Sequence, residues 1–349
     1  MAKKPKILEA KFEQTLIYAD GPQVVLLSSV SGSKVIAVAI PSFPNYQYPF
    51  FAAQVSSAQF SDYLNEKFDL RYLLFKPDFK RNFFFDLGSL KEDIVSLERA
   101  PKLSPEKYEE YLPDSGLFAR DHTEELGSNI SGPQNEQTFG VDGSWDLYEF
   151  SHFYNNVTDL YAFFNSIDIF QNDNLPEEKR ERIQNAFVKP FEGGGSYVSL
   201  YDSLSAVQAR EDRLHVGGIS YNSPGYVKLR GFEKPFTEIK SLIVNLESNH
   251  VTISNQYKDL YGILKKNKML RMRSEKFNSE SSIAEVISVH AKKMADVLDV
   301  VEYDALLVMS GNNMLVVAKV LLSLCRRAIR LNEFFLEGRV SFDVPTSQK

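Results

Sequence analysis

The densest group of metal-binding residue types is Arg120-Asp121-His122-Thr123-Glu124-Glu125, which sets one histidine among three carboxylates. Carboxylate oxygens and an imidazole could together hold a hard or borderline divalent ion. Solvated charge in a polar connector explains the same composition, and we favour that interpretation. The other histidines are scattered and form no pair four residues apart, namely His152, His215, His250 and His290. We therefore expect no metal site and no cofactor.

Three further patterns resemble parts of catalytic or phosphate-binding motifs. Gly193-Gly194-Gly195-Ser196 could present backbone N–H groups to an anion, but no lysine closes the loop as in a P-loop. Asp168 with Glu177-Glu178-Lys179 has the composition of a carboxylate nuclease, yet acids at this position favour a helix start. The single cysteine, Cys325, falls on an apolar stripe, where a thiol behaves as a small hydrophobe. No catalytic constellation is complete, so the sequence leaves open whether the chain is an enzyme.

Basic residues form the most prominent candidate surface. Six of them crowd twelve positions and are our candidates for nucleic-acid binding: Lys265, Lys266, Lys268, Arg271, Arg273 and Lys276. Three more follow on the last predicted helix, at Arg326, Arg327 and Arg330. Lysine and arginine side chains neutralise phosphates and supply most of the sequence-independent affinity for nucleic acid.

A third basic group lies among aromatic residues. Arg71, Lys76, Lys80 and Arg81 accompany Tyr72, Phe75, Phe79 and the run Phe83–Phe85. Basic residues beside aromatic rings can hold single-stranded nucleic acid by charge and stacking. The alternative is that Phe83–Phe85 form a buried strand whose ends the charges solvate.

The composition is that of a globular protein rich in aromatic residues. Hydrophobic residues make up 43% and charged ones 25%, with 26 Phe and 17 Tyr, so thick aromatic cores are expected. The net charge of −6 argues against a general polyanion binder but permits local basic patches. One cysteine allows no disulfide within the chain, which is typical of a reducing compartment, and we expect a cytoplasmic protein.

Neither a secretory signal nor a membrane span is expected. The basic start, residues 1–6, is followed by Ile7-Leu8-Glu9-Ala10-Lys11 and not by a continuous apolar run. Ala305–Cys325 is rich in leucine and valine, but Ser310-Gly311-Asn312-Asn313 and Lys319 interrupt it. A bilayer helix needs about 20 mostly apolar residues. A buried helix is therefore the simpler interpretation, with no membrane association.

The helices and strands that the sequence predicts, which would position these residues, indicate an α+β fold. Residues 1–97 are expected to form a β-rich, barrel-like domain with short helices at Ala58–Phe68 and Leu70–Phe75. The run Val24–Leu27 is apolar without alternation, which predicts a strand covered on both faces. Residues 98–143 lose this periodicity and carry four prolines, so we interpret them as a polar connector between domains.

Residues 144–349 are expected to form a helix-rich α+β domain that contains a β-hairpin. Ser144 is the candidate N-cap of its first helix. Strands are predicted at Leu214–Tyr221 and Tyr226–Gly231, and Pro224-Gly225 fits the central positions of a type II turn. Helices follow at residues 235–248, 253–266 and 281–300, and a last short strand at 340–344.

The last helix has the clearest pattern. Asn312 or Asn313 can cap it, and Gly338 can end it in the left-handed conformation. Its apolar stripe alternates spacings of three and four, and the opposite side carries Lys319, Ser323, Arg326, Arg330 and Glu333. Such a stripe could be the core of its own domain or the interface of a homo-oligomer. We favour the core.

Two segments resemble uncharacterised bacterial proteins. Ile7–Leu87, with Tyr18-Ala19-Asp20-Gly21-Pro22 and Leu70-Arg71-Tyr72-Leu73-Leu74, resembles a bacterial domain of unknown function. The segment Ile219–Gly225 is similar to a hairpin that recurs in uncharacterised bacterial proteins. Neither is a catalytic motif. The resemblance implies a bacterial origin and an accessory or antiviral-defence setting.

The leading functional hypothesis is a non-catalytic interaction or regulatory protein of a bacterial cytoplasmic complex, with a protein partner. It depends on the missing catalytic constellation and on the long last helix. The first alternative is a nucleic-acid-binding component of a bacterial system, for which anti-phage defence is one setting. The second alternative is an enzyme of unfamiliar type, because active sites assemble from residues distant in sequence.

Overall fold

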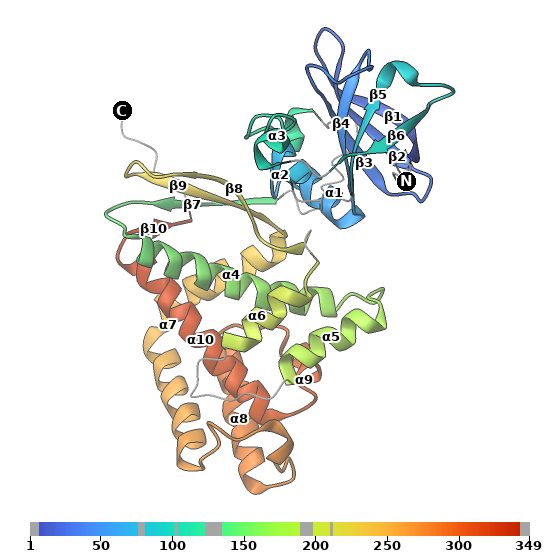
Figure 1. Cartoon of the computed structure of the whole chain (residues 1–349). Helices are drawn as coiled ribbons and strands as arrows, with labels where there is room; N and C mark the ends of the chain where they lie inside the picture. Colours follow the sequence, from blue (N-terminus) through green and yellow to red (C-terminus); the bar gives the residue numbers. More distant parts are fainter. Residues whose placement is uncertain are drawn as a thin grey trace. The chain divides into compact units, whose positions relative to one another are not determined.

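The structure is a computed structural model that describes residues 7–75, 81–101, 104–122, 135–188, 198–209 and 212–342. The chain divides into two compact units, Met1–Ser131 and Gly132–Lys349. The first unit is a barrel, and the second combines a small sheet with a helical bundle (Figure 1). The predicted α+β class is confirmed.

The barrel of the first unit closes through six antiparallel strands. Each strand pairs with the next, and the sixth returns to the first. The strands are β1 (Ile7–Tyr18), β2 (Pro22–Ser29), β3 (Lys34–Ala39), β4 (Pro49–Val55), β5 (Asn82–Asp86) and β6 (Ile94–Arg99). Helices α1 (Ser57–Leu64) and α2 (Leu70–Phe75) connect β4 to β5. The barrel-like prediction for the N-terminal part is confirmed.

Alternating side chains of these strands belong to two separate cores. Val25 and Leu27 of β2 contribute to one cluster, which is made of strand residues and includes Phe83 and Phe85. Val24 and Leu26 contribute to the other, which α1 and α2 complete with residues such as Tyr63 and Leu73. Strand β2 is therefore covered on both faces, as predicted. The run Phe83–Phe85 is buried as well, so it is a core strand and not a stacking surface.

Regular structure also occurs within residues 98–143. Strand β6 ends at Arg99, α3 spans Pro105–Glu109, and the short 3-10 helix η3 spans Ala119–Asp121. Strand β7 (Asn135–Val141) follows and pairs with the hairpin of the second unit. The division between the two compact units falls between α3 and β7, at Ser131 and Gly132.

The second unit has a four-stranded sheet in the order β10-β7-β9-β8 and seven α-helices among its described residues. Its other strands are β8 (His215–Ser220), β9 (Gly225–Gly231) and β10 (Val340–Ser341). Its helices are α4 (Leu147–Phe170), α5 (Glu177–Val188), α6 (Val198–Val207), α7 (Glu233–Lys266), α8 (Ser282–Val297), α9 (Tyr303–Met309) and α10 (Met314–Leu336). Helix α7 contains both predicted helices, with non-helical backbone at Asn249 between them.

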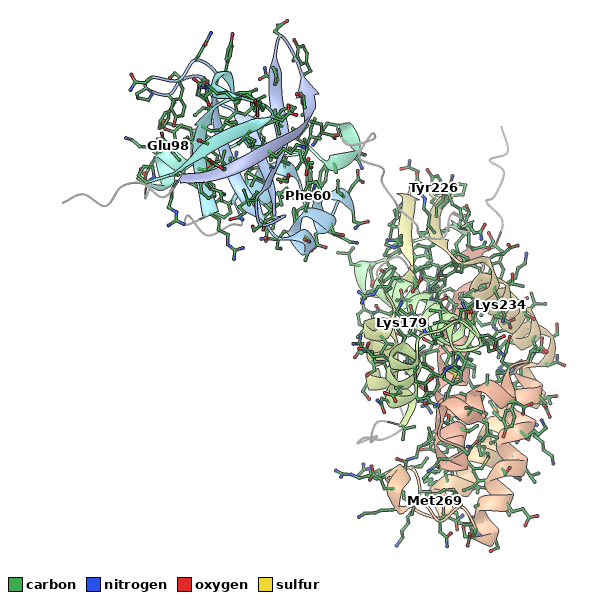
Figure 2. All side chains as sticks on the ribbon, turned by 90° about the vertical axis from the view of Figure 1, so that its right-hand side faces the viewer. Phe60, Glu98, Lys179, Tyr226, Lys234 and Met269 are labelled. Carbon is green, nitrogen blue, oxygen red and sulfur yellow. The ribbon has the colours of Figure 1, made fainter. Side chains whose placement is uncertain are left out.

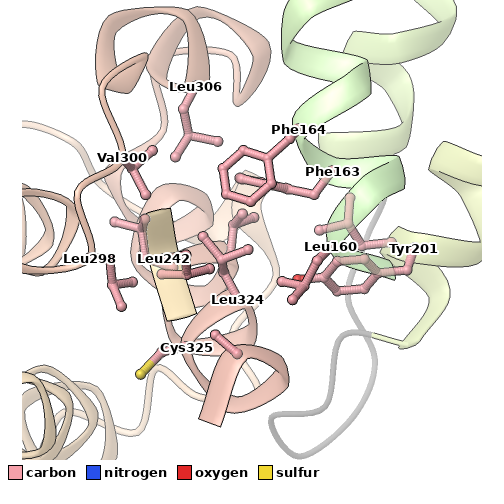
Figure 3. Packing of buried hydrophobic residues seen from close by; sticks show 14 of the residues in the cluster. Leu160, Phe163, Phe164, Tyr201, Leu242, Leu298, Val300, Leu306, Leu324 and Cys325 are labelled. Carbon is pink, nitrogen blue, oxygen red and sulfur yellow. The ribbon is translucent and has the colours of Figure 1, made fainter. Parts of the chain in front are cut away.

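Leu324 and Cys325 of helix α10 lie among buried residues of other helices, such as Leu160 of α4 and Leu242 of α7 (Figure 3). Asn313 caps α10 by accepting from the backbone N–H groups of Leu315 and Val316, and Gly338 follows it with φ +71°, both as predicted. Its apolar stripe packs within its own unit, against α4, α7 and α8. Cys325 is fully buried, and burial raises the pKa of its thiol to about 12. No helix among the described residues is both long and apolar enough to cross a membrane.

Two local predictions about caps and turns are wrong. Asp146, and not Ser144, caps α4, because its carboxylate accepts from Glu149 N while the Glu149 carboxylate accepts from Asp146 N. The hairpin strands are confirmed, but Pro224-Gly225 is not a type II turn. Gly225 is the first residue of β9 and has no positive φ, and the Ser223–Pro224 peptide is cis.

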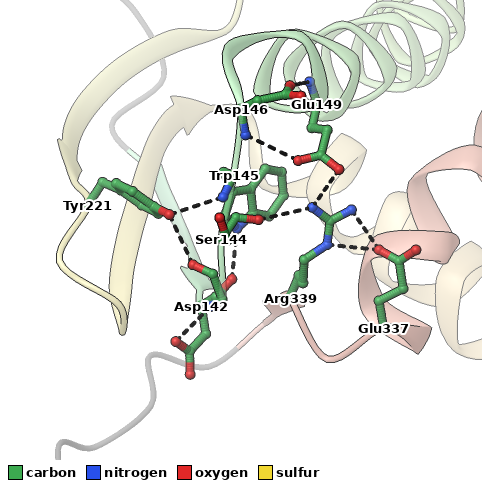
Figure 4. Close-up of polar contacts among 9 residues, drawn as sticks. Asp142, Ser144, Trp145, Asp146, Glu149, Tyr221, Glu337 and Arg339 are labelled. Carbon is green, nitrogen blue, oxygen red and sulfur yellow. Dashed lines mark hydrogen bonds and ion pairs between the residues drawn. The ribbon is translucent and has the colours of Figure 1, made fainter.

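A polar network anchors the sheet to both α4 and α10 (Figure 4). Arg339 pairs with Glu149 at 3.0 Å and Glu337 at 2.7 Å, and its guanidinium lies 4.8 Å from the Trp145 ring centroid. Tyr221 Oη donates to the Gly143 carbonyl at 2.9 Å and accepts from Trp145 N at 3.1 Å. The end of α10, the start of α4 and the hairpin are thereby held together.

Candidate nucleic-acid interface

The six predicted basic residues surround the end of α7 and the segment that follows it. All six side chains are exposed. Lys265 and Lys266 form the last turn of α7, Lys268 follows with φ +56°, and Lys276 ends the short 3-10 helix η6 (Ser274–Lys276). Met269 lies at this tip of the second unit (Figure 2). The structure thus presents this predicted site on the surface.

The start of α10 holds the basic segment in place. The ammonium of Lys319 donates to the Met272 carbonyl at 2.6 Å, and the Asn313 amide donates to the Ser274 carbonyl at 3.1 Å. Met269 is buried, and its N–H donates to the Leu264 carbonyl at 2.8 Å. Lys319 is buried, and this burial lowers its pKa to about 8. The prediction that Lys319 lies on a polar face is therefore wrong, because the side chain is buried and its ammonium donates to the Met272 carbonyl.

The arginines of α10 join the same surface through Tyr257 of α7. Arg326 Nη1 donates to Tyr257 Oη at 2.9 Å, and Arg330 lies exposed one helical turn further along α10. Tyr257, Tyr261 and Lys265 succeed one another four residues apart, so they share one side of α7. We call the combined surface the basic strip. It consists of Tyr257, Lys258, Tyr261, Lys265, Lys266, Lys268, Arg271, Arg273, Lys276, Arg326 and Arg330.

The local charge of this region is opposite in sign to that of the whole chain. Residues 250–279 contain seven lysines and arginines and two acids, Asp259 and Glu275, whereas the chain carries −6. Asp259 comes two residues after Tyr257, so its side chain does not share the side of α7 that carries the tyrosines. The strip therefore has a net positive field, although the protein is acidic.

Arg327 does not belong to the strip, although the sequence grouped it with Arg326 and Arg330. Its guanidinium is buried, pairs with Asp159 of α4 at 2.5 Å, and donates to Ser323 Oγ at 2.8 Å. It also lies 3.6 Å from the centroid of the Tyr201 ring. Ser323, predicted on the polar face, is buried with it. Arg327 is thus a core residue that links α10 to α4 and α6.

The other candidates from the sequence are explained by structural contacts or lie outside the described residues. His122 contacts Tyr63 through its ring nitrogen, and Arg120 pairs with Glu66, while residues 123–125 lie outside the described part. Among the described residues, no group of three or more His, Cys, Asp or Glu side chains could hold a metal ion. Gly193–Ser196 lie outside the described residues as well.

The suspected nuclease carboxylates and the third basic group are also engaged in structural contacts. Asp168 pairs with Lys234 at 2.9 Å, and Glu177 and Glu178 pair with Arg180 and Arg182 within the first turns of α5. In the third basic group, Arg71 pairs with Glu109 and donates to the Pro113 carbonyl. Lys76, Phe79 and Lys80 lie outside the described residues. These contacts favour structural roles for the side chains that the structure describes.

Sequence reasoning missed the aromatic part of the strip. Neither Tyr257 nor Tyr261 is among the candidate residues that the sequence patterns indicate. The spacing of four residues from Tyr257 through Tyr261 to Lys265 was visible in the sequence. The contact with Arg326, 69 positions further on, was not.

In comparisons with known proteins, no family model matches the chain, and neither a curated protein nor a solved structure matches it.

Proposed function

We propose that this chain is a non-catalytic nucleic-acid-binding protein and that the basic strip is its binding surface. The observation that carries the proposal is that residues 258–276 carry seven exposed basic side chains and that Arg326 of α10, with Arg330 one turn further, contacts Tyr257 beside this segment. Non-specific nucleic-acid binding depends on phosphate neutralisation by such residues. The resemblance noted for the N-terminal segment adds the expectation of a bacterial setting, which the genomic neighbourhood of the coding sequence would test.

An acidic protein can carry such a site because salt screens its distant acidic residues from a phosphate bound at the strip. Exposed charges further apart than about 8–10 Å are largely screened at physiological salt. Nearby phosphates would therefore interact with the strip more strongly than with the net charge of −6. The interaction should weaken steeply as salt concentration rises, because bound phosphates release their counterions.

Replacing four residues of the strip tests the proposal. We expect the variant to bind a labelled 20-nucleotide single-stranded oligonucleotide about 100-fold more weakly at 50 mM salt, because four phosphate contacts are lost. The slope of log affinity against log salt should fall by about 0.7 per lost contact. Fluorescence anisotropy between 50 and 200 mM salt measures both quantities. The substitutions are Lys265→Ala, Lys266→Ala, Arg271→Ala and Arg273→Ala.

A matched variant removes the same formal charge from other exposed positions of the second unit. It carries Lys179→Ala, Arg182→Ala, Lys240→Ala and Lys293→Ala. We expect its affinity to stay within about threefold of the wild type. Equal losses in the two variants would show a general charge effect and remove the assignment to the strip. Absence of wild-type binding to single- and double-stranded DNA and RNA at low salt would refute the function.

A second candidate function, protein–protein interaction, is favoured by strand β8. Val216 and Ile219 lie opposite Leu229 and Val227, on the face of the sheet that packs on the helices. They are nevertheless 51% and 52% exposed, and β8 pairs with β9 and with no other strand that the structure describes. Such an edge can accept an added strand from a partner.

A second copy of the chain is the partner that is most directly tested. Because the apolar stripe of α10 packs inside its own unit, we propose β8 and not α10 as the contact. Light scattering after gel filtration should then show a dimer at micromolar concentration, and Ile219→Lys should convert it to a monomer because a charge opposes apolar pairing. A wild-type monomer under these conditions would exclude self-association.

A further inference from the structure

We propose that the basic strip selects single-stranded nucleic acid and that unpaired bases stack on Tyr257 and Tyr261. This inference rests on the proposed function and specifies its ligand. Charge by itself attracts any polyanion, whereas an aromatic ring adds affinity only for a ligand with accessible base faces. The two tyrosines therefore decide which class of nucleic acid the strip prefers.

The two rings have a fixed mutual arrangement. They are parallel within 9°, and their centroids lie 6.0 Å apart on consecutive turns of α7. Both are half-buried, so each packs against the helical core on one part and remains open to solvent on another. Arg326 holds Tyr257 through the hydrogen bond to its hydroxyl oxygen. Rings fixed in this way lose little conformational entropy when a ligand binds.

The charges lie where a backbone that follows the rings would pass. Lys258 is exposed three residues before Tyr261 and Lys265 is exposed four residues after it, so both neighbour Tyr261 on the helix surface, and Arg330 extends the strip along α10. From Tyr257 to Lys266, the last residue of α7, the helix axis rises about 13.5 Å at about 1.5 Å per residue. Binding sites of this kind begin at about four nucleotides. A short single strand could therefore engage both rings and the basic end.

A duplex and a polyanion without bases cannot stack bases on Tyr257 and Tyr261. In a duplex the base faces are stacked inside the helix, so the tyrosines would not reach them. A strand without bases offers phosphates and no ring to stack. The inferred order of affinity at equal length and salt is single strand, then duplex, with the abasic strand binding at least tenfold more weakly than the single strand.

The first arm of the experiment uses the unchanged protein. Anisotropy is measured with three labelled 12-mers: a single-stranded DNA of mixed sequence, its duplex, and a strand of abasic residues. Tighter binding of the single strand than of both other probes supports the inference. Equal affinity for the normal and abasic strands overturns it and leaves the proposed function standing. Failure of all three probes to bind refutes the proposed function itself.

The second arm changes the rings. The double variant Tyr257→Leu/Tyr261→Leu keeps apolar packing but removes the aromatic faces, and should bind the single strand about 10- to 100-fold more weakly. Its salt slope and its affinity for the abasic strand should not change, because no charge is altered. Tyr257→Phe/Tyr261→Phe should retain single-strand affinity within about threefold, since the rings remain. Unchanged single-strand affinity in the leucine variant would contradict the inference, whatever the effect of the lysine substitutions.

Discussion

Replacing Arg327 with methionine is expected to lower the free energy of unfolding of the second unit by about 3 kcal/mol. Arg327 is buried, while the Asp159 side chain is 26% exposed to solvent. Removal of one partner of such a pair leaves the other charge buried without compensation. The variant also loses the hydrogen bond to Ser323 and the guanidinium contact with the Tyr201 ring. Partial exposure of Asp159 places the expected loss at the lower end of the usual range.

The pH dependence gives this prediction a distinct signature. Burial raises the pKa of Asp159 above that of an ordinary aspartate, although Arg327 opposes the shift. Loss of the arginine should raise this pKa further. Between the unfolded and folded pKa values the folded state binds more protons, so stability falls as pH rises through that window. The destabilisation of Arg327→Met should therefore be complete at neutral pH and shrink as pH approaches 4.

The fluorescence of Trp145, the one tryptophan of the chain, measures the free energy of unfolding. Its ring stacks on Phe334 at 5.0 Å within the second unit, so its fluorescence in a urea titration follows the unfolding of this unit. Arg330→Met, at an exposed position on the same helix, should change stability by less than about 0.5 kcal/mol. Adding Asp159→Asn to Arg327→Met should recover part of the loss and remove the acid dependence. A loss below about 1 kcal/mol that does not vary with pH would contradict the ionic explanation.

Elements whose pattern repeats along the chain could be predicted from the sequence. The apolar run of β2 predicted a strand covered on both faces, and Asn313 and Gly338 indicated the two ends of α10. Asp146 was missed as a cap because Ser144 has equal preference for that position. The capping box with Glu149 distinguishes the two residues once the helix register is known.

The surroundings of single polar residues could not be predicted in the same way. Lys319 and Arg327 occupy α10 positions that a helical wheel cannot identify as buried, because the residues that bury them belong to other elements. Lys319 donates to the Met272 carbonyl in the segment after α7, and Arg327 contacts Asp159 of α4 and Tyr201 of α6. Similarly, the sequence located the six basic residues of the candidate site but not the tyrosines beside them. Their role depends on the packing of α7 against α10.

Substitution of Gly225 by alanine should destabilise the second unit by about 3 kcal/mol, the upper end of the cost of overpacking. A Cβ atom at this position would lie 2.2 Å from the Ser220 carbonyl oxygen and 3.1 Å from Tyr221 Cα. Both neighbours are backbone atoms across the hairpin, so no side chain can rotate away. The turn would have to open, which would move Tyr221 from its hydrogen bonds to Gly143 and Trp145. Glycine is therefore required here for close approach and not for a positive φ.

Gly218 offers a control in the same hairpin. The nearest atom to a Cβ there is Tyr226 Cε2 at 3.8 Å, an ordinary contact, and its φ is not in the positive range. Gly218→Ala should therefore leave the unfolding free energy within about 1 kcal/mol of the wild type. For a unit of this size, Gly225→Ala should lower the melting temperature followed by Trp145 fluorescence by about 6–12 °C. Equal effects of the two substitutions would show that loss of glycine flexibility, and not the contact with Ser220, determines the cost at Gly225.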